Sequence, residues 1–463
     1  MNADIKNECL VYIKSNLDKV VLIFLLLVFF AFSMFIALNL QPGIMPDEPA
    51  HFAFSTHFSS TIGIPPDTDQ TASLGWYIRQ NPFLYHWIMG RLINLTRFIY
   101  SDVTDWQLLV VLRVVNSLFA LGTVIICYLL SKEVIKHKWW QLLPVFIITN
   151  LLMFVFLSAA VNYDNLANLF SVIGLFFHVR VLNEKRFIAN SLLWMIFISL
   201  GTLVKFTILP LALAMFIVWL VYVIKSNNEH TRFKFNLPEI GYSILLILLV
   251  LGNLSIYGVN LVLYRDLTPS CQEILTISQC ELSPYLLRAR ESALQQKLTI
   301  SEARAMGYPS PIGYALVDWV WFMLIRTVGV TGHQSYLPFH TITYYQILFY
   351  WIALMGLVNL IVHRQFEFTK ASLVFISIFY AIVLIIMNYN AELTYGFQQI
   401  ALQGRYIFPV IAALLVLVTS VIRNIPSKLI RWPTLIFTLG LFLYGGSITI
   451  IYGYNIFFAN WFL

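Results

Sequence analysis

The sequence predicts an all-α protein that crosses a membrane many times. Of its 463 residues, 59% are hydrophobic and 11% are charged, whereas soluble domains carry about 25% charged residues. Apolar runs of about 20 residues recur between short basic segments, and that length matches the hydrocarbon core of a bilayer. The alternating strands typical of outer-membrane barrels do not appear. We therefore expect residues 1–463 to form a single integral membrane domain.

Eleven membrane-spanning helices are expected from these apolar runs. They lie near residues 20–40, 107–131, 139–159, 165–182, 190–204, 207–224, 239–264, 342–362, 371–389, 403–422 and 432–453. The first run is long, and no small-residue cleavage site precedes Gln41. We expect it to remain as an anchor and not to be removed as a signal peptide.

Basic residues predict the orientation of these spans. More than half of the 29 Lys and Arg residues fall in short connections that lie on one side of the membrane. They are Lys6, Lys14, Lys19, Lys132, Lys136, Lys138, Lys185, Arg186, Lys225, Arg232, Lys234, Arg364, Lys370, Arg423, Lys428 and Arg431. Short loops rich in Lys and Arg stay in the cytoplasm. The N-terminus is therefore expected inside, and the long segments 41–106 and 265–341 are expected outside.

The two outer segments contain apolar stretches that are not counted as spans. The basic loops all lie on one side only if the stretch from Ile312 to Val330 does not cross the membrane completely. It contains Trp319, Asp318 and Arg326, a mixture typical of a helix that lies at the interface or re-enters the membrane. Residues 74–100 have the same character, and simple interfacial anchoring accounts for most of their aromatic side chains.

Charge and cysteine content exclude several classes of function. The net charge of +7 comes from Lys and Arg between the spans, where they meet anionic lipid, so membrane lipids are expected as partners and nucleic acid is not. Neither a zinc-type cysteine spacing nor a Walker loop nor a dinucleotide fingerprint is present. Cys271 and Cys280 lie nine residues apart in the second outer segment. The sequence leaves open whether they form a disulfide.

Ionisable residues gather in four places on the predicted outer face. Asp47, Glu48 and His51 directly follow the first span, where paired acids are costly unless they meet water, a cation or a substrate. The other three groups are Asn162, Tyr163, Asp164 and Asn165; Lys205; and Gln403, Gly404, Arg405 and Tyr406. Taken singly, the first acids fit a solvated turn, the cations fit snorkelling side chains, and Asp164 fits a helix N-cap. Four such groups on one face instead predict a site.

The mixture of acids and fixed cations suits transfer of a group from a lipid phosphate. A carboxylate can take the proton of an attacking hydroxyl. A guanidinium offers two-point recognition of the leaving phosphate. A lipid-anchored substrate would also explain why the catalyst is embedded in a membrane.

Four motifs of the sequence resemble those of a known protein family. PDEPAHF at 46–52, VNYDNLAN at 161–168, LVKFTILPL at 203–211 and QGRYIFP at 403–409 resemble a bacterial family of multi-pass proteins long known only as a domain of unknown function. That family is similar to the GT-C glycosyltransferases, which use polyprenyl-phosphate sugars. The serotype-converting glucosyltransferases that decorate O-antigen are the closest functional analogy.

The resemblance implies roles for individual residues. Asp47 is expected to act as the catalytic base, with Glu48 as its catalytic neighbour or as a metal or acceptor ligand. Arg405 and Lys205 are expected to bind the donor phosphate. The remaining substrate-binding residues are expected to be His51, Asp164, Gln403 and Tyr406. The first outer segment has no separate Asp-x-Asp motif, so a divalent cation remains an open alternative and no other cofactor is implied.

The activity implied by the resemblance is inverting transfer of a monosaccharide, by analogy glucose, from a polyprenyl-phosphate donor. The acceptor would be a lipid-linked or surface glycan, such as the O-antigen of lipopolysaccharide. The reaction would take place on the outer face of a bacterial cytoplasmic (inner) membrane. The alternative is a transporter or flippase for lipid-linked sugars. Transporters place ionisable residues near the bilayer midplane within repeated halves, and the sequence shows neither feature, which favours the enzyme.

Overall fold

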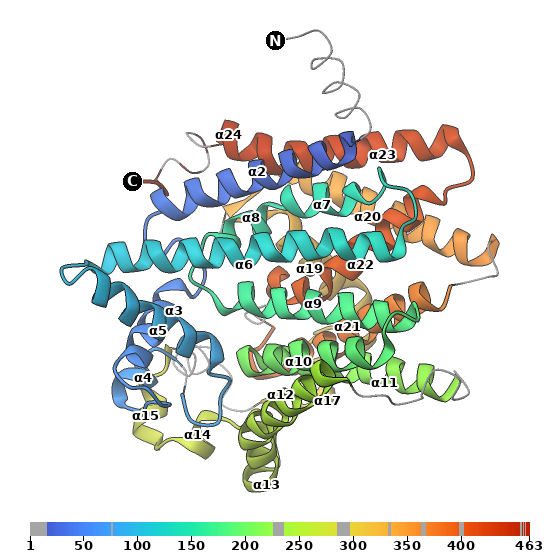
Figure 1. Ribbon diagram of the computed structural model, residues 1–463. Helices are drawn as coiled ribbons and strands as arrows, with labels where there is room; N and C mark the ends of the chain where they lie inside the picture. Colours follow the sequence, from blue (N-terminus) through green and yellow to red (C-terminus); the bar gives the residue numbers. More distant parts are fainter. Residues whose placement is uncertain are drawn as a thin grey trace.

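The computed structural model describes residues 16–75, 77–225, 236–284, 297–331, 335–362, 367–397, 402–453, 456, 458 and 460–463. Regular structure within them is helical apart from two short strands, β1 (Val330–Thr331) and β2 (Ser335–Tyr336), which pair antiparallel. The predicted all-α membrane fold is confirmed (Figure 1). Five basic residues used to predict the orientation lie outside the described residues: Lys6, Lys14, Arg232, Lys234 and Arg364.

The N-terminal half contains α2 (Leu17–Asn39), α3 (Glu48–Ser59), α4 (Asp69–Ser73), α5 (Leu84–Ile99), α6 (Asp105–Val134), α7 (Leu142–Thr149), α8 (Leu152–Ser158), α9 (Tyr163–Leu182), α10 (Phe187–Val204), η1 (Phe206–Ile208) and α11 (Leu209–Lys225). The C-terminal half contains α12 (Leu237–Asn253), η2 (Leu254–Gly258), α13 (Val259–Tyr264), α14 (Cys271–Ile274), α15 (Ile277–Glu281), α17 (Ile300–Ala305), α18 (Pro311–Gly313), η3 (Tyr314–Trp319), α19 (Val320–Val328), α20 (Phe339–Val362), α21 (Phe368–Tyr395), η4 (Gly404–Val410), α22 (Ile411–Arg423), α23 (Lys428–Leu443), η5 (Tyr444–Ile448) and α24 (Thr449–Gly453).

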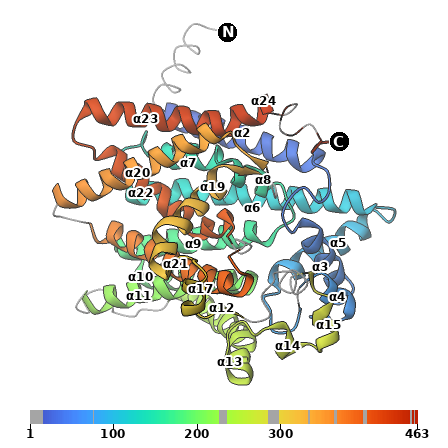
Figure 2. The same ribbon diagram turned by 180° about the vertical axis from the view of Figure 1, so that it is seen from behind.

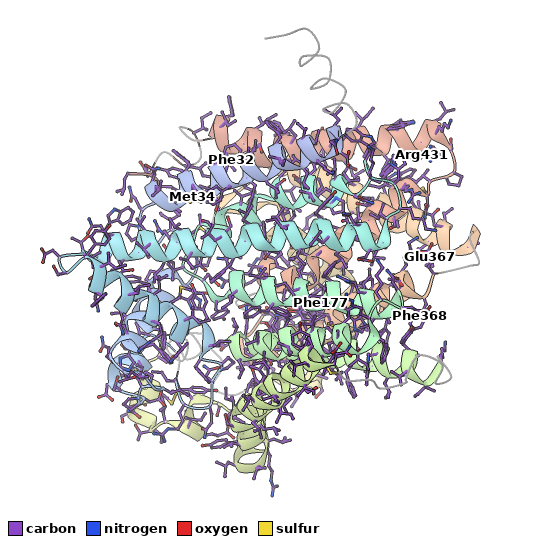
Figure 3. All side chains as sticks on the ribbon, in the orientation of Figure 1. Phe32, Met34, Phe177, Glu367, Phe368 and Arg431 are labelled. Atoms are coloured by element: carbon purple, nitrogen blue, oxygen red, sulfur yellow. A yellow bond between two sulfur atoms is a disulfide. The ribbon has the colours of Figure 1, made fainter. Side chains whose placement is uncertain are left out.

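The long helices lie side by side, and the short helices α3, α4, α5, α14 and α15 gather at one end of the bundle, on the left in Figure 1. We call this the site end. The C-terminal end of α2 lies there, and its Asn39 carbonyl accepts a hydrogen bond from the Leu463 amide at 2.8 Å. The opposite end contains Asp18, which pairs with Lys138 at 3.1 Å, and Arg431, which is labelled in Figure 3. Because residues 17 and 463 lie at opposite ends, the chain crosses the bundle an odd number of times.

Eleven helices among the described residues are long and apolar enough to cross a membrane, but they are not the eleven that the sequence predicts. The predicted span 139–159 is broken into α7 and α8, neither of which is long enough alone. Together they still connect the far end of α6 with the start of α9 at the site end. The chain therefore runs from one end of the bundle to the other there, through a helix interrupted at Asn150 and Leu151.

The segment Pro311–Val328 meets the length and composition of a span, and two of its side chains make hydrogen bonds at the site end. The Trp319 indole donates to Asn388 near the end of α21, and Thr327 contacts the carbonyl of Gly404 at the start of η4. Figure 2 shows this helix, in gold between α17 and α19, standing across the direction of α21 and α22. These contacts and the odd number of crossings favour the predicted interfacial or re-entrant position.

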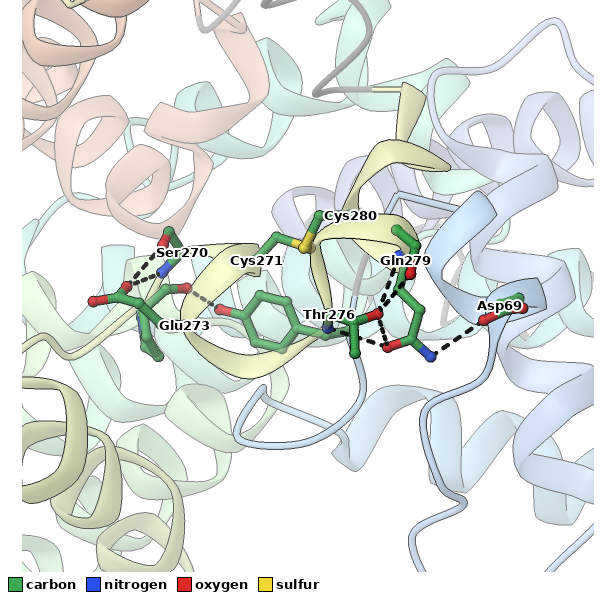
Figure 4. The surroundings of a disulfide bond; sticks show 10 residues. Asp69, Ser270, Cys271, Glu273, Thr276, Gln279 and Cys280 are labelled. Carbon is green, nitrogen blue, oxygen red and sulfur yellow. Dashed lines mark hydrogen bonds between the residues drawn. A yellow bond between two sulfur atoms is a disulfide. The ribbon is translucent and has the colours of Figure 1, made fainter.

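The two outer segments are joined to each other at the site end. Cys271 and Cys280 form a disulfide with a Cα–Cα distance of 5.8 Å, which answers the question that the sequence leaves open. Gln279 beside this disulfide donates to Asp69 of the first outer segment at 3.2 Å (Figure 4). The Tyr77 hydroxyl of the first segment donates to the Pro269 carbonyl of the second at 2.5 Å. The first and second outer segments are thus joined into one layer over the site end, which we call the cover.

Gly446 lies where the kinked helix α23–η5–α24 crosses the break between α7 and α8. A Cβ added at Gly446 would lie 2.3 Å from the Asn150 carbonyl oxygen, and the Ser447 hydroxyl donates to the Asn150 side chain at 2.7 Å. Since real Cβ atoms do not approach backbone so closely, the two helices can meet here only at a glycine.

We expect Gly446→Ala to destabilise the protein by about 1–3 kcal/mol, the usual cost of overpacking. Thermal unfolding in detergent would show this as a lower melting temperature. Gly440→Ala is the matched control, because a Cβ at Gly440 of the same helix meets nothing within 4 Å. An equal melting temperature for the two variants would contradict the close approach.

Candidate active site

The corner between α2 and α3 separates the two predicted acids. Asp47 precedes α3 in the left-handed conformation (φ 62°), which Asp adopts more readily than most residues. Its carboxylate pairs with the guanidinium of Arg405, and about a quarter of its side chain is exposed. Glu48, the first residue of α3, is 1% exposed and pairs with Arg113 of α6. Neighbouring acids therefore have different partners and different exposure.

Glu48 is placed to hold helices together. Arg113 donates to its two oxygens at 2.8 and 2.6 Å, and the Val161 amide donates to the first of them at 3.0 Å. Arg113 also donates to the Leu40 carbonyl at 2.5 Å, beyond the C-terminal end of α2. The sequence analysis missed Arg113. The signal was an arginine inside the predicted span 107–131, since an intramembrane charge requires a partner.

Three buried residues from distant segments complete a chain of alternating charges with Asp47. Arg405 pairs with Asp47, its Nε lies 3.4 Å from Oδ2 of Asp164, and Oδ1 of Asp164 pairs with Lys205. The side chains of Arg405, Asp164 and Lys205 are 4%, 3% and 5% exposed, so these charges are compensated mainly by one another. The structure thus brings together residues from all four groups that the sequence singles out.

The backbone explains how these side chains reach one another. Asn162, and not Asp164, is the N-cap of α9, since its Oδ1 accepts from the Asp164 amide at 2.9 Å. This leaves the Asp164 carboxylate to face Lys205. Lys205 lies in extended conformation between α10 and η1. Gly404 lets η4 approach the backbone of α19 closely, because a Cβ at Gly404 would lie 2.2 Å from the carbonyl carbon of Arg326.

Aromatic rings surround the cations of the site. The Lys205 ammonium lies 4.6 Å from the ring centroids of both Tyr163 and Tyr406, within the range of cation–π attraction. Burial lowers the pKa of Lys205, and the nearby Asp164 carboxylate opposes that shift. The predicted site residue Tyr406 therefore contacts Lys205. Gln403 is half-buried and accepts the Tyr406 amide at its backbone carbonyl at 3.0 Å.

Two neutral imidazoles support Tyr163. Nδ1 of His51 lies 3.0 Å from Nε2 of His86, and the His51 ring meets the edge of the Tyr163 ring with centroids 4.3 Å apart. Burial lowers the pKa of His51 well below its usual value and that of His86 to about 3. Both rings are therefore uncharged at neutral pH. His86, on α5, is a second residue that the sequence analysis missed.

Arg405 retains hydrogen-bonding capacity inside the protein. Its Nη1 is buried without a hydrogen-bond partner among the described residues, and its Nε meets Oδ2 of Asp164 as an ion pair at 3.4 Å but not as a hydrogen bond. Leaving a buried polar group unsatisfied costs about 1–3 kcal/mol, and more for a charged group. An anion that accepts from these nitrogens would recover that free energy.

The described residues contain no group of three or more His, Cys, Asp or Glu side chains arranged to hold a metal ion. Both oxygens of Glu48 already accept hydrogen bonds from Arg113 or Val161. These hydrogen bonds point to a structural part for Glu48 within the described residues.

Comparison with known proteins places this geometry in context. The sequence model of one protein family, the dolichyl-phosphate-mannose-protein mannosyltransferases, matches residues 80–255. No relative was found among curated proteins. The structure of ArnT from Cupriavidus metallidurans bound to undecaprenyl phosphate aligns with a TM-score of 0.49 at 12% identity, covering 93% of this chain and 62% of that one.

A second solved structure is the archaeal oligosaccharyltransferase AglB from Archaeoglobus fulgidus in complex with an inhibitory peptide and a dolichol-phosphate. It aligns with a TM-score of 0.46 at 15% identity, covering 95% of this chain and 56% of that one. The chain thus spans about three fifths of the length of these proteins. Residues 80–255, which include Asp164 and Lys205, resemble a GT-C mannosyltransferase family, as the sequence predicts.

Proposed function

We propose that this protein is an inverting glycosyltransferase of the GT-C type. It would transfer a monosaccharide from a polyprenyl-phosphate donor to a surface or lipid-linked glycan, such as O-antigen, with glucose as the sugar suggested by analogy. The observation that carries the proposal is the buried charge chain Asp47–Arg405–Asp164–Lys205, in which Arg405 has an N–H group with no hydrogen-bond partner in the described part of the chain. The family match over residues 80–255 supports the same reaction class.

The positive-inside rule supports an outward-facing site. Lys19, Lys132, Lys138 and Arg431 belong to the end of the bundle opposite the charge chain, the end that this rule assigns to the cytoplasm. We therefore propose that the charge chain faces the outside of a bacterial inner membrane.

The charges of the site suit a phosphate donor. Two carboxylates and two cations balance, and a sugar phosphodiester brings one negative charge. During transfer the acceptor oxygen forms a bond to the anomeric carbon while the bond from that carbon to the phosphate oxygen breaks. Asp47 takes the acceptor proton and becomes neutral, while the leaving phosphate gains one negative charge. The total charge of the cavity is therefore unchanged, which keeps the cost of the step low inside a protein.

Arg405 connects donor binding with the base. A phosphate that accepts from the end of the guanidinium, Nη1 together with Nη2, would compete with Asp47, which is bound to Nη2. Loss of that ion pair makes the Asp47 carboxylate a stronger base, since a nearby cation stabilises the ionised form. Donor binding would thus activate Asp47 at the point when the acceptor must be deprotonated.

We expect Asp47→Asn to lower sugar transfer by about 100- to 10,000-fold, the usual contribution of a general base. Transfer of labelled sugar by purified protein, with donor and acceptor supplied on the same side, measures this. Asp102→Asn, an exposed acid of the same outer segment, is the control. Near-normal turnover by Asp47→Asn would contradict its role, and a wild-type protein that moves the lipid without making product would favour the flippase.

We expect Arg405→Lys to lower kcat/KM for the donor by about 10- to 100-fold, because an ammonium keeps the charge but loses the planar two-point contact. Arg304→Lys is the matched control, since Arg304 is exposed on α17. An unchanged kcat/KM in Arg405→Lys would show that the phosphate binds elsewhere.

Glu48→Gln should act on stability, in contrast to Asp47→Asn. Breaking a buried ion pair costs about 3–5 kcal/mol, so thermal unfolding in detergent should show a clear loss for Glu48→Gln and little change for Asp47→Asn. The partial exposure of Asp47 is the reason for the difference. A Glu48→Gln protein of normal melting temperature but without activity would instead make Glu48 a catalytic residue.

A further inference from the structure

A cavity of about 190 Å³ lies beside the charge chain, under the cover formed by the two outer segments. Its walls come from α3, the turn before α5, α5 itself, the start of α9, the α10–η1 corner and the second outer segment. The lining residues that matter here are Tyr163 and Lys205, which also belong to the charged site, and Asn81, His86, Phe206 and Thr268. The cavity therefore adjoins the place where we expect the donor phosphate to bind.

Aromatic rings form most of the cavity wall. Six of the lining residues are Phe or Tyr: Phe54, Phe58, Tyr77, Phe83, Tyr163 and Phe206. Apolar and aromatic walls with a few polar groups that fix orientation are typical of small-molecule pockets. The ring faces can pack against the C–H faces of a sugar, and the polar groups can bind its hydroxyls. A lipid acyl chain in the cavity would leave the polar groups without hydrogen bonds. Water alone would make no use of the aromatic rings.

The polar lining groups are neutral apart from Lys205. Asn81 donates from its Nδ2 to the Tyr77 carbonyl at 3.1 Å, which fixes the amide and leaves its Oδ1 as an acceptor for a sugar hydroxyl. Thr268 contributes a hydroxyl from the other outer segment. None of the described lining residues is an Asp or Glu. The carboxylates of Asp67, Asp266 and Glu273 act on Tyr77, and each already accepts a backbone hydrogen bond. The positive charge of Lys205 is already matched by Asp164.

We propose that this cavity binds the transferred monosaccharide and that this sugar is neutral, with Asn81 and Thr268 as specificity-determining residues. The inference rests on the proposed glycosyl transfer. An amino sugar would bring a second cation next to Lys205, where the nearby carboxylates are already engaged by Lys205 or by backbone amides, and burying a poorly paired charge is costly. A uronic acid would bring an anion whose natural partner, Lys205, is already neutralised.

The closure of the cavity depends on both outer segments. Thr268 directly precedes Pro269, whose carbonyl accepts from Tyr77, and the disulfide of Cys271 follows two residues later. Asn81 and Thr268, which belong to different outer segments, are thereby held at one pocket by fixed contacts. Fixed polar groups discriminate between sugars better than mobile ones, because their hydrogen bonds lose less entropy on binding.

Binding measurements with purified full-length protein test the proposal without requiring turnover. The probes are polyprenyl phosphate alone and polyprenyl phosphate carrying glucose, glucosamine or glucuronic acid, which differ by one group. We expect the glucosyl lipid to bind at least tenfold more tightly than either charged analogue. Asn81→Ala and Thr268→Val should weaken the binding of the glucosyl lipid by several fold. Both variants should leave the affinity for polyprenyl phosphate unchanged. Asn81→Asp should shift the preference towards glucosamine.

Ser278→Ala, at an exposed position of the same outer segment, is the control variant and should match the wild type. Equal binding of all three sugars, or an effect of Asn81→Ala on polyprenyl phosphate itself, would overturn the pocket assignment while leaving glycosyl transfer intact. Failure of the wild type to bind any of the four lipids would instead overturn the proposed function. The two failures are therefore distinguishable.

Discussion

The alternating ion pairs between Asp47, Arg405, Asp164 and Lys205 are the interaction on which the site depends. The buried charges of Arg405, Asp164 and Lys205 compensate one another, whereas Asp47 is about a quarter exposed. They come from four segments separated by up to 358 residues, so the helices must be packed correctly before the charges can meet. This requirement links the fold of the membrane domain with its chemistry.

A second buried ion pair, Glu48 with Arg113, fixes the geometry of the first. It joins the end of α2, the helix α6 and the turn before α9. Because Glu48 follows Asp47 directly, anchoring the one carboxylate sets the position of the other. Two adjacent acids therefore differ in their surroundings: Glu48 is buried at the corner, and Asp47, the proposed base, is partly exposed.

Much of the fold follows from the sequence because apolar length is a strong signal in membranes. The helical class and the recurrence of helices long and apolar enough to cross a membrane agree with it, while the interfacial position of Pro311–Val328 stays a prediction. The break of 139–159 at Asn150 was not foreseen, because it depends on a long-range contact with Gly446. The sequence named the members of the charge chain, but not their pairing or the role of Arg113, since these depend on three-dimensional packing.

The central claim is that the cations of the charge chain bind the donor phosphate. A cryo-electron-microscopy structure with polyprenyl phosphate bound would test it most directly. The account predicts the phosphate within hydrogen-bonding distance of the Arg405 guanidinium and close to the Lys205 ammonium, with Asp47 released from Arg405. A phosphate bound at another place, with the Asp47–Arg405 pair intact, would contradict the account.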